Sequence, residues 1–132
     1  MIPCLFVAGD RQVRDVVKVG LDQTGAFALD MADDKWAIDL AKARRYQVVI
    51  ADSTLSDGSD GLDFLTEVRA VLPEAELLLV ARGKAQGRLA SRDKQKLGVY
   101  AALAFPVEPL EFFKTLGRLL DRLKHATAKA GA

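Results

Sequence analysis

Residues 46–69 read YQVVIADSTLSDGSDGLDFLTEVR, and this stretch decides the fold class. Its first six residues form a short apolar run rich in β-branched side chains, which predicts a strand over residues 46–51 that leads into Asp52. The loop that follows is rich in Ser, Asp and Gly through Gly61, and Pro73 prevents the next segment from continuing. Between them, apolar side chains recur at helical spacing at Leu62, Leu65, Val68 and Leu72. The stretch therefore predicts a strand, a loop and a helix in succession.

The same alternation continues on both sides of this unit. Further short apolar runs predict strands over residues 2–8, 26–31, 76–81 and 99–105. Helical spacing predicts a helix over residues 11–21, another that begins at Asp33 or Asp34, and a last one that begins at Pro109. The apolar positions of these three helices are Val13, Val16, Val17, Gly20 and Leu21; Trp36, Ala37, Leu40 and Ala41; and Leu110, Phe113, Leu116, Leu120 and Leu123. Residues 82–97 carry few apolar side chains and predict only a marginal helix.

Five strands alternating with five helices predict a parallel sheet, because each parallel pairing needs a crossover and the helices supply it. We therefore expect an α/β fold, with a doubly wound five-stranded parallel sheet and helices on both faces. A length of 132 residues fits one domain of ordinary size. We expect that domain to span residues 1–124, with residues 125–132 as a C-terminal tail or the start of a linker.

The composition excludes several classes of protein. Nineteen basic and 18 acidic residues give a formal net charge of +1, so nothing global favours nucleic acid or an anionic membrane. The single cysteine, Cys4, cannot form an internal disulfide, which favours a reducing cytoplasm. No apolar run approaches the length of about 20 residues that spans a bilayer, and no basic stretch precedes the first apolar run. The sequence therefore predicts a cytoplasmic protein without a membrane span.

Ligand sites of doubly wound sheets lie at the carboxyl ends of the strands. The residues expected there are Ala8, Gly9, Asp10, Asp52, Val80, Ala81, Phe105 and Pro106. No glycine-rich dinucleotide fingerprint follows the first strand, and no phosphate-binding loop ends in Lys and Ser or Thr. Classical nucleotide binding is therefore disfavoured, and these strand ends offer few groups for catalysis.

The stretch that opens this section resembles the receiver domain of bacterial two-component response regulators. The resemblance rests on the strand ending at Asp52, the loop from Leu55 to Gly58, the Asp60, Gly61 and Leu62 that open the helix, and Arg69 near its end. It covers nearly the whole chain, since the first strand and the last strand with its following proline align in the same order. Ser56 stands where the family usually has proline. The resemblance implies a flavodoxin-like fold with strand order 2-1-3-4-5.

The resemblance also implies a phosphorylation site, and this sequence departs from it. In the family, an acidic pair after the first strand and the phosphoacceptor aspartate hold Mg²⁺; the pair is matched here by Ala8 and Gly9. The Ser or Thr after the fourth strand is matched by Val80, the conserved lysine by Phe105 and the aromatic switch residue by Ala102. Of these polar positions only the phosphoacceptor, Asp52, is kept, so the sequence predicts a degenerate receiver, or pseudo-receiver.

Taken together, the replacements at Ala8, Gly9, Val80 and Phe105 indicate that a polar pocket has become an apolar one. We expect Phe105 to fill the space of the lost lysine. For the peptide bond from Phe105 to Pro106, the cis isomer is favoured more than it is for a typical bond before proline. Asp10, one residue beyond Gly9, is the nearest acid that could substitute for the missing pair. The role of Asp52 is then either that of a phosphoacceptor or that of an acid that caps the following turn.

The strongest local charge signal lies in the marginal helix over residues 82–97. Its basic residues are Arg82, Lys84, Arg88, Arg92, Lys94 and Lys96. In receivers the fourth helix, fifth strand and fifth helix form the common surface for partners and dimers. An acidic partner, a nucleotide second messenger and nucleic acid stay open for this segment beside a simple solvated face, although the absence of interleaved aromatic residues weakens nucleic acid.

Three functions follow from these observations. The first is a receiver-like signalling module that acts by protein–protein interaction or self-association, without aspartyl phosphorylation, catalysis, metal or cofactor. The second is a true phosphoacceptor receiver that uses Asp52 in a phosphorelay and therefore binds Mg²⁺. The third is an enzyme or small-molecule binder that uses the crevice at the strand ends.

Overall fold

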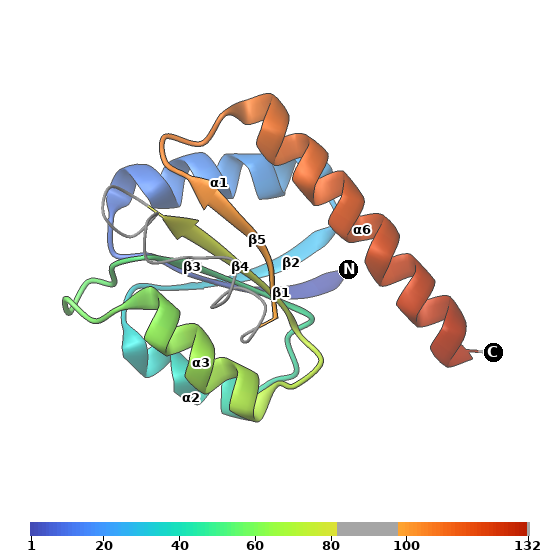
Figure 1. The fold of residues 1–132 in the computed structure, drawn as a ribbon, viewed down its shortest axis with the longest axis horizontal. Helices are drawn as coiled ribbons and strands as arrows, with labels where there is room; N and C mark the ends of the chain where they lie inside the picture. Colours follow the sequence, from blue (N-terminus) through green and yellow to red (C-terminus); the bar gives the residue numbers. More distant parts are fainter. Residues whose placement is uncertain (82–97, 132) are drawn as a thin grey trace.

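The computed structural model describes residues 1–81 and 98–131, with side chains through residue 125. Its sheet has five parallel strands in the order β2-β1-β3-β4-β5, as predicted (Figure 1). The strands are β1 (Ile2–Val7), β2 (Phe27–Ala32), β3 (Val48–Asp52), β4 (Glu76–Ala81) and β5 (Val99–Ala104). The predicted flavodoxin-like order is therefore confirmed, and the carboxyl ends of all five strands lie at the same edge of the sheet.

Helices cover both faces of the sheet (Figure 1). They are α1 (Arg11–Thr24), the short 3-10 helix η1 (Lys35–Ala37), α2 (Ile38–Ala43), α3 (Gly61–Val71) and α6 (Pro109–Gly131). Helices α1 and α6 lie on one face, and α2 and α3 lie on the other. The marginal helix expected over residues 82–97 lies outside the described residues.

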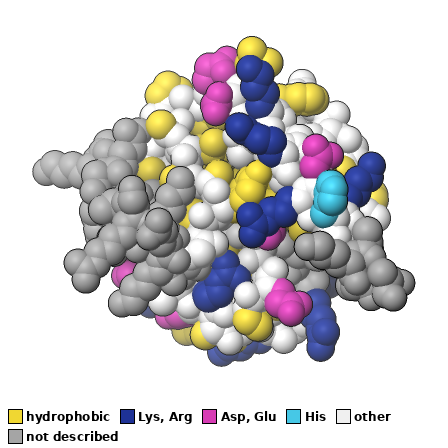
Figure 2. Space-filling view, turned by 45° about the vertical axis from the view of Figure 1, so that its right-hand side comes forward, with side chains coloured by type: hydrophobic (Ala, Val, Ile, Leu, Met, Phe, Trp, Pro, Cys, Tyr) yellow, Lys and Arg dark blue, Asp and Glu magenta, His cyan; other side chains and the backbone are white. Residues whose placement is uncertain are grey.

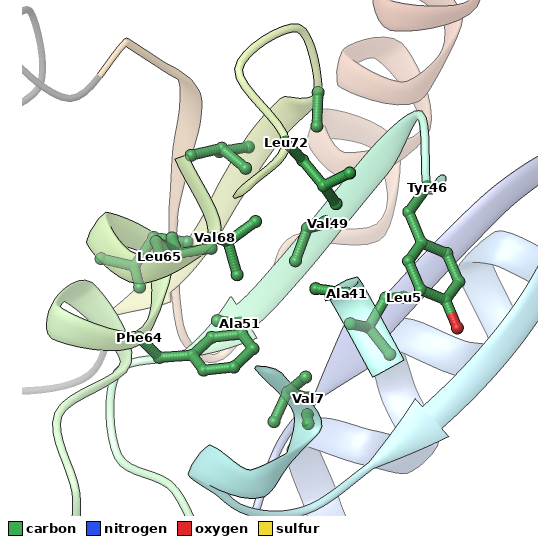
Figure 3. Packing of buried hydrophobic residues seen from close by; sticks show 14 of the residues in the cluster. Leu5, Val7, Ala41, Tyr46, Val49, Ala51, Phe64, Leu65, Val68 and Leu72 are labelled. Atoms are coloured by element: carbon green, nitrogen blue, oxygen red, sulfur yellow. The ribbon is translucent and has the colours of Figure 1, made fainter. Parts of the chain in front are cut away.

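Alternation along the strands builds one hydrophobic core on each face, because successive side chains of a strand point to opposite sides. In β1, Leu5 and Val7 belong to the core beneath α2 and α3, whereas Cys4 and Phe6 belong to the core beneath α1 and α6. Figure 3 shows the first of these cores, in which Phe64 and Leu65 of α3 pack against β-strand residues and Ala41 of α2. The strands carry apolar side chains on both faces because both faces are covered.

Local sequence signals set the helix ends. The carboxylate of Asp10 accepts a hydrogen bond from the Val13 amide at 3.1 Å and so caps α1. Gly25 ends α1 with a left-handed φ of 65°, a conformation that favours glycine. The Glu108 carboxylate accepts hydrogen bonds from the amides of Leu110 and Glu111 at the start of α6. Pro109 is the first residue of α6, as predicted.

The structure corrects the predicted apolar face of the last helix. Leu116 of the predicted stripe is buried, and Leu120 and Leu123 pack against the core. Leu110 and Phe113, however, are 60% and 51% exposed, whereas Phe112 and Leu119, which were not predicted, are buried. Two neighbouring stripes of α6 are apolar, so helical spacing alone could not choose between them. Packing against the sheet chose the stripe that includes Phe112.

Two further helix positions also differ from the prediction. Val16 of α1 is 42% exposed and Trp36 is 66% exposed, although both were expected on buried stripes. Trp36 lies in η1, where a 3-10 turn of three residues changes the phase of the helix that follows. The Lys35 ammonium lies 5.9 Å from the centre of the Trp36 ring.

The chain continues as helix beyond the expected domain boundary. Helix α6 extends to Gly131, through the region expected to be a tail after residue 124, and Figure 1 shows its last turns running clear of the sheet. No helix in residues 1–81 or 98–131 is long and apolar enough to cross a membrane.

Candidate functional site

Asp52 is the last residue of β3, and it is completely buried. It lies opposite Val80 in the sheet, and the Ser53 amide donates a hydrogen bond to the Val80 carbonyl at 2.8 Å. Asp52 Oδ1 accepts no hydrogen bond from the described residues, while the residue takes part in other interactions. The structure thus places Asp52 at the strand-end edge, beside the apolar side chain of Val80.

The matches to the acidic pair carry no polar side chains, and the second position has no room for one. Ala8 is completely buried, and its amide donates to the Ala32 carbonyl at 3.1 Å. A Cβ atom on Gly9 would lie 2.4 Å from the Ser56 amide nitrogen and 2.7 Å from the Ser56 Cα. Both are backbone atoms, so an acidic side chain at position 9 requires the loop after β3 to move.

That loop is held in place by hydrogen bonds within it and to the connection between β2 and η1. The Ser56 amide donates to the Asp33 carbonyl at 2.7 Å, which ties the loop to the connection between β2 and η1. The Leu55 side chain is buried, and Gly58 adopts a left-handed φ of 82°. The amide and hydroxyl of Ser59 donate to the Asp57 carboxylate, and the hydroxyl bond is the main reason that the pKa of Asp57 is lowered. The backbone above Gly9 is therefore fixed rather than loosely placed.

Gly61 fixes the start of α3 directly against Asp52. A Cβ atom at position 61 would lie 1.8 Å from the Asp52 carbonyl oxygen, so only glycine allows this approach. The Gly61 amide donates to the Ser53 carbonyl at 2.9 Å, and the Asp60 carboxylate caps the helix. The predicted loop and helix start are thus the elements that enclose Asp52.

The other pocket positions form part of the core beneath α1 and α6. Ala8 and Val80 are buried members of that core, and the half-buried ring of Phe105 packs against it. The Phe105 amide donates to the Ala81 carbonyl at 3.0 Å, and the bond from Phe105 to Pro106 is cis. Ala102 is half-buried in β5, opposite Leu79 of β4.

These residues do not fit a magnesium ion. Mg²⁺ needs oxygen ligands in near-octahedral geometry, and the strand end of β1 supplies apolar or absent side chains. Asp10, the nearest acid, caps α1 with its carboxylate. Within the described part of the chain, no three His, Cys, Asp or Glu side chains gather in a way that could hold a metal ion. The predicted basic surface, Arg82, Lys84, Arg88, Arg92, Lys94 and Lys96, lies outside the described residues.

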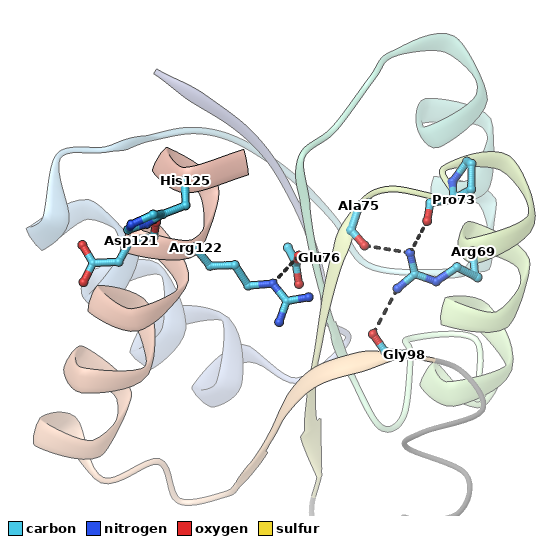
Figure 4. A network of polar contacts seen from close by, with 8 residues as sticks. All are labelled: Arg69, Pro73, Ala75, Glu76, Gly98, Asp121, Arg122 and His125. Atoms are coloured by element: carbon cyan, nitrogen blue, oxygen red, sulfur yellow. Dashed lines mark hydrogen bonds and ion pairs between the residues drawn. The ribbon is translucent and has the colours of Figure 1, made fainter. Parts of the chain in front are cut away.

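Arg69 has a role that the sequence did not reveal, although its place at the end of α3 was part of the resemblance. Its guanidinium donates to the carbonyls of Pro73 and Ala75 at 2.8 Å and to that of Gly98 at 3.1 Å (Figure 4). One side chain thus joins the end of α3, the start of β4 and the residue before β5. Nothing in the sequence pairs Arg69 with backbone oxygens so far along the chain.

Two surface hollows were also not predicted. One, of about 410 Å³, lies between α1 and α6 and is lined by Val16, Val19, Gly20, Phe112 and Phe113 among others. The other, of about 1010 Å³, includes Lys42, Arg44 and Arg45 in its lining. In the view of Figure 2, Lys and Arg side chains lie around apolar ones near His125, the only histidine. The first hollow is lined mostly by apolar side chains.

Comparison with known proteins identifies the fold. No family model and no curated protein matches the sequence. The solved structures similar to this chain include the chemotaxis response regulator CheY4 of Vibrio cholerae, with 23% identity, a TM-score of 0.73 and coverage of 89% of this chain and 98% of that one.

Two further solved structures superpose more closely at lower identity. The signal receiver domain of an HD domain-containing protein from Pseudomonas fluorescens Pf-5 is 20% identical, with a TM-score of 0.80 and coverage of 97% of this chain and 92% of that one. A CheY-like receiver domain protein from Methanospirillum hungatei JF-1 is 17% identical, with a TM-score of 0.80 and coverage of 96% and 98%. With the sheet order and the strand-end geometry described above, these matches show that the chain has the fold of the CheY-like response regulator receiver domains.

Proposed function

We propose that this chain is a cytoplasmic signalling module of a bacterial two-component or related regulatory system that acts by protein–protein interaction, without aspartyl phosphorylation. It is not an enzyme, and it uses neither a metal nor another cofactor. Its fold is that of a receiver, whereas its strand-end site lacks the groups that receivers use for phosphoryl transfer.

One observation carries this proposal: the backbone of Ser56 occupies the space into which a side chain at position 9 would extend. If only the acidic residue at position 9 had been replaced, the rest of the site would still have room for it. Here the loop after β3 closes directly over Gly9 and is bonded to the Asp33 carbonyl. The loop leaves no room for a side chain at position 9, and the residue there is glycine. This agreement supports a site that is adapted to the absence of the acid.

The neighbouring apolar positions support the same conclusion. A phosphorylated Asp52 would carry additional negative charge, which needs a cation or hydrogen-bond donors nearby. Val80 and Phe105 cannot donate hydrogen bonds from their side chains. Both instead pack in or against the core that contains Ala8.

The test is backbone NMR of the full chain titrated with Mg²⁺ and then with beryllofluoride, a mimic of the phosphoryl group. We expect no saturable shifts at Gly9, Asp10, Asp52 or Val80. The matched control is Asp52→Ala, whose spectrum should respond to the additions no differently from that of the parent chain.

The opposite result would favour the second function, a true phosphoacceptor in a phosphorelay. Saturable shifts confined to the strand-end residues and lost in Asp52→Ala would show that Asp52 accepts the phosphoryl mimic. That outcome would overturn the interaction-only proposal. A partner surface on residues 82–97, β5 and α6 stays a prediction under either function.

A further inference from the structure

The larger of the two surface hollows lies at the amino ends of the strands. Its volume is about 1010 Å³, and its lining includes residues 44–47, which lead into β3, and residues 73–75, which lead into β4. Asp52 is the last residue of β3, so in this parallel sheet the hollow and Asp52 lie at opposite edges. The hollow is therefore separate from the strand-end site, and none of the functions considered above uses it.

Basic residues dominate the charged part of this hollow. Lys42, Arg44 and Arg45 line it, against one acidic residue, Glu74. Lys42 and Arg45 are exposed, and the salt bridges among the described residues involve neither of them. Two cations are therefore open to an anion from solution.

The third cation, Arg44, is oriented by a small hydrogen-bond network. The Asp30 carboxylate accepts hydrogen bonds from the Arg44 guanidinium at 2.9 Å and from the Tyr46 hydroxyl at 2.6 Å. Tyr46 is buried, which fixes its hydroxyl, whereas 64% of the Arg44 side chain is exposed. A guanidinium carries its N–H donors in a planar fork, so one bond to Asp30 leaves donors for a second anion. An oriented arginine binds that anion at a lower entropic cost than a mobile one.

Carbonyl oxygens at the ends of α2 and α3 would oppose an anion here, because the carboxyl end of a helix is partially negative. Several of these oxygens already accept hydrogen bonds. The Leu40 carbonyl of α2 accepts one from the Arg44 amide at 2.9 Å. The carbonyls of Pro73 and Ala75, which follow α3, each accept one from the Arg69 guanidinium at 2.8 Å (Figure 4). Arg69 thus covers two oxygens and adds a positive charge beside the hollow.

Apolar residues form another part of the lining. Val71 is 36% exposed, Leu123 is half-buried and Pro73 is exposed, and all three line the hollow. A hollow of this size accommodates a small organic molecule. A ligand that joins an anion to an apolar or planar group would contact both parts of the lining.

The charges favour an anion that carries more than one negative charge. The three basic residues of the lining and Arg69 make four cations, and only Asp30 and Glu74 offset them. A phosphate ester carries about two negative charges and three acceptor oxygens, whereas a carboxylate carries one charge. An organic phosphate therefore matches both the charge and the apolar lining.

We propose that this hollow, which we call the basic hollow, binds a small organic phosphate. Lys42, Arg44 and Arg45 hold the phosphate, and Val71 and Leu123 contact the body of the molecule. The proposal goes beyond the interaction function above, since it concerns the opposite edge of the sheet and does not depend on the state of Asp52.

The test is backbone NMR of the full chain titrated with ADP, pyrophosphate and adenosine, each without Mg²⁺. ADP carries both phosphate and a planar base, whereas each of the other two probes carries only one of these parts. We expect saturable shifts at residues 42–47 and 71–75, with ADP binding at least about threefold more tightly than pyrophosphate and adenosine not binding. Pyrophosphate that binds as tightly as ADP would overturn the role assigned to the apolar lining.

Charge reversal in the lining should weaken the binding of ADP. Lys42→Glu and Arg45→Glu should each raise Kd by at least about tenfold, because each removes a charge-assisted contact and adds repulsion. The matched control is Lys114→Glu, which makes the same charge change at an exposed position of α6 outside the lining. It should leave Kd within about twofold, because salt screens distant exposed charges. All three positions are exposed, so thermal denaturation should show an intact fold.

Arg44→Lys tests the oriented guanidinium rather than the charge. Lysine keeps the positive charge but lacks the planar fork, so Kd for ADP should rise by about threefold or more. An unchanged Kd would overturn the role assigned to the network of Asp30, Tyr46 and Arg44.

Three results would overturn the proposal as a whole. ADP could give no saturable shifts up to about 10 mM, or Lys42→Glu and Arg45→Glu could bind it as tightly as the parent chain. Lys114→Glu could also weaken binding as much as they do, which would show attraction by overall charge only. Asp52→Ala should bind ADP as the parent chain does. ADP and beryllofluoride report on residues at opposite edges of the sheet, so failure of this proposal and failure of the proposed function are distinguished.

Discussion

The strand-end site and the outer side of helices α1 and α6 use apolar residues in opposite ways. We call the second region the α1–α6 face, and its exposed apolar residues are Val16, Val19, Leu110 and Phe113. At the strand-end site, Ala8 and Val80 are completely buried, at positions that the resemblance matches to polar groups of receivers. On the α1–α6 face, Val19 and Phe113 remain more than half exposed where a solvated helix would have polar groups. The comparison teaches that one region buries its apolar side chains completely, while the other leaves them on the surface.

The glycines of the two regions differ in the same way. Gly9 and Gly61 lie against backbone atoms, whereas Gly117 has open space where a side chain would be. Substitution of these glycines should therefore separate the enclosed region from the open one.

Gly61→Ala should be the most damaging single change. The new Cβ would lie 1.8 Å from the Asp52 carbonyl oxygen, and neither backbone segment can move without breaking the start of α3. We expect a loss of about 3–4 kcal/mol in the free energy of unfolding, measured by urea denaturation. A loss below about 1 kcal/mol would show that the backbone around Gly61 shifts easily, and the strand-end site would then not be tightly enclosed.

Gly9→Asp should destabilise the fold without creating a metal site. The side chain meets the Ser56 backbone, so the free energy of unfolding should fall by about 2–3 kcal/mol. Urea denaturation with and without Mg²⁺ measures both effects, because a bound ion would raise stability. Stabilisation of this variant by millimolar Mg²⁺ would mean that the loop opens readily and that one substitution is enough to create a metal site.

Phe105→Ala and Phe113→Ala form a matched pair across the two regions. Phe105 packs against a buried core, so its truncation should lower the free energy of unfolding by about 2 kcal/mol. Phe113 is 51% exposed, so its truncation should change monomer stability by less than about 0.5 kcal/mol. Denaturation at low protein concentration checks both values. Equal losses of stability would show that the two rings do not differ in how much they contribute to packing.

Gly117→Ala should have a small effect of the opposite sign. The methyl group meets no described atom, and alanine restricts the unfolded chain more than glycine does. The free energy of unfolding of the monomer should rise by about 0.5–1 kcal/mol, measured by thermal or urea denaturation at low concentration. A destabilised variant would indicate that Gly117 is already covered within the monomer.

Much of the fold could be predicted from local patterns. Short apolar runs and helical spacing gave the five parallel strands and the flanking helices, and the resemblance gave their order. The start of α6 at Pro109 could be predicted because proline favours the first turn of a helix. The buried face of α6 could be predicted only in part: Leu116 is buried as expected, but both Phe112 and Phe113 lie on stripes of apolar residues and only the sheet distinguishes them.

The candidate site, like the fold, has features that the sequence predicts and features that depend on tertiary contacts. The sequence showed that polar groups are missing at Ala8, Gly9, Val80 and Phe105, because residue types can be read at aligned positions. It did not show that the Ser56 backbone closes over Gly9, which depends on the hydrogen bond from the Ser56 amide to Asp33. Arg69 likewise gained its role only when folding brought Gly98 within 3.1 Å of its guanidinium.

The sequence by itself determined the fold class and which chemical groups the strand ends could offer. Both follow from short-range properties: side-chain periodicity, turn residues and the identity of each side chain. The tertiary structure decided which apolar stripe is buried, which glycines are enclosed and which apolar surface remains on α1 and α6. Those outcomes depend on contacts between segments far apart in the chain, and a residue's own type does not specify its neighbours in space.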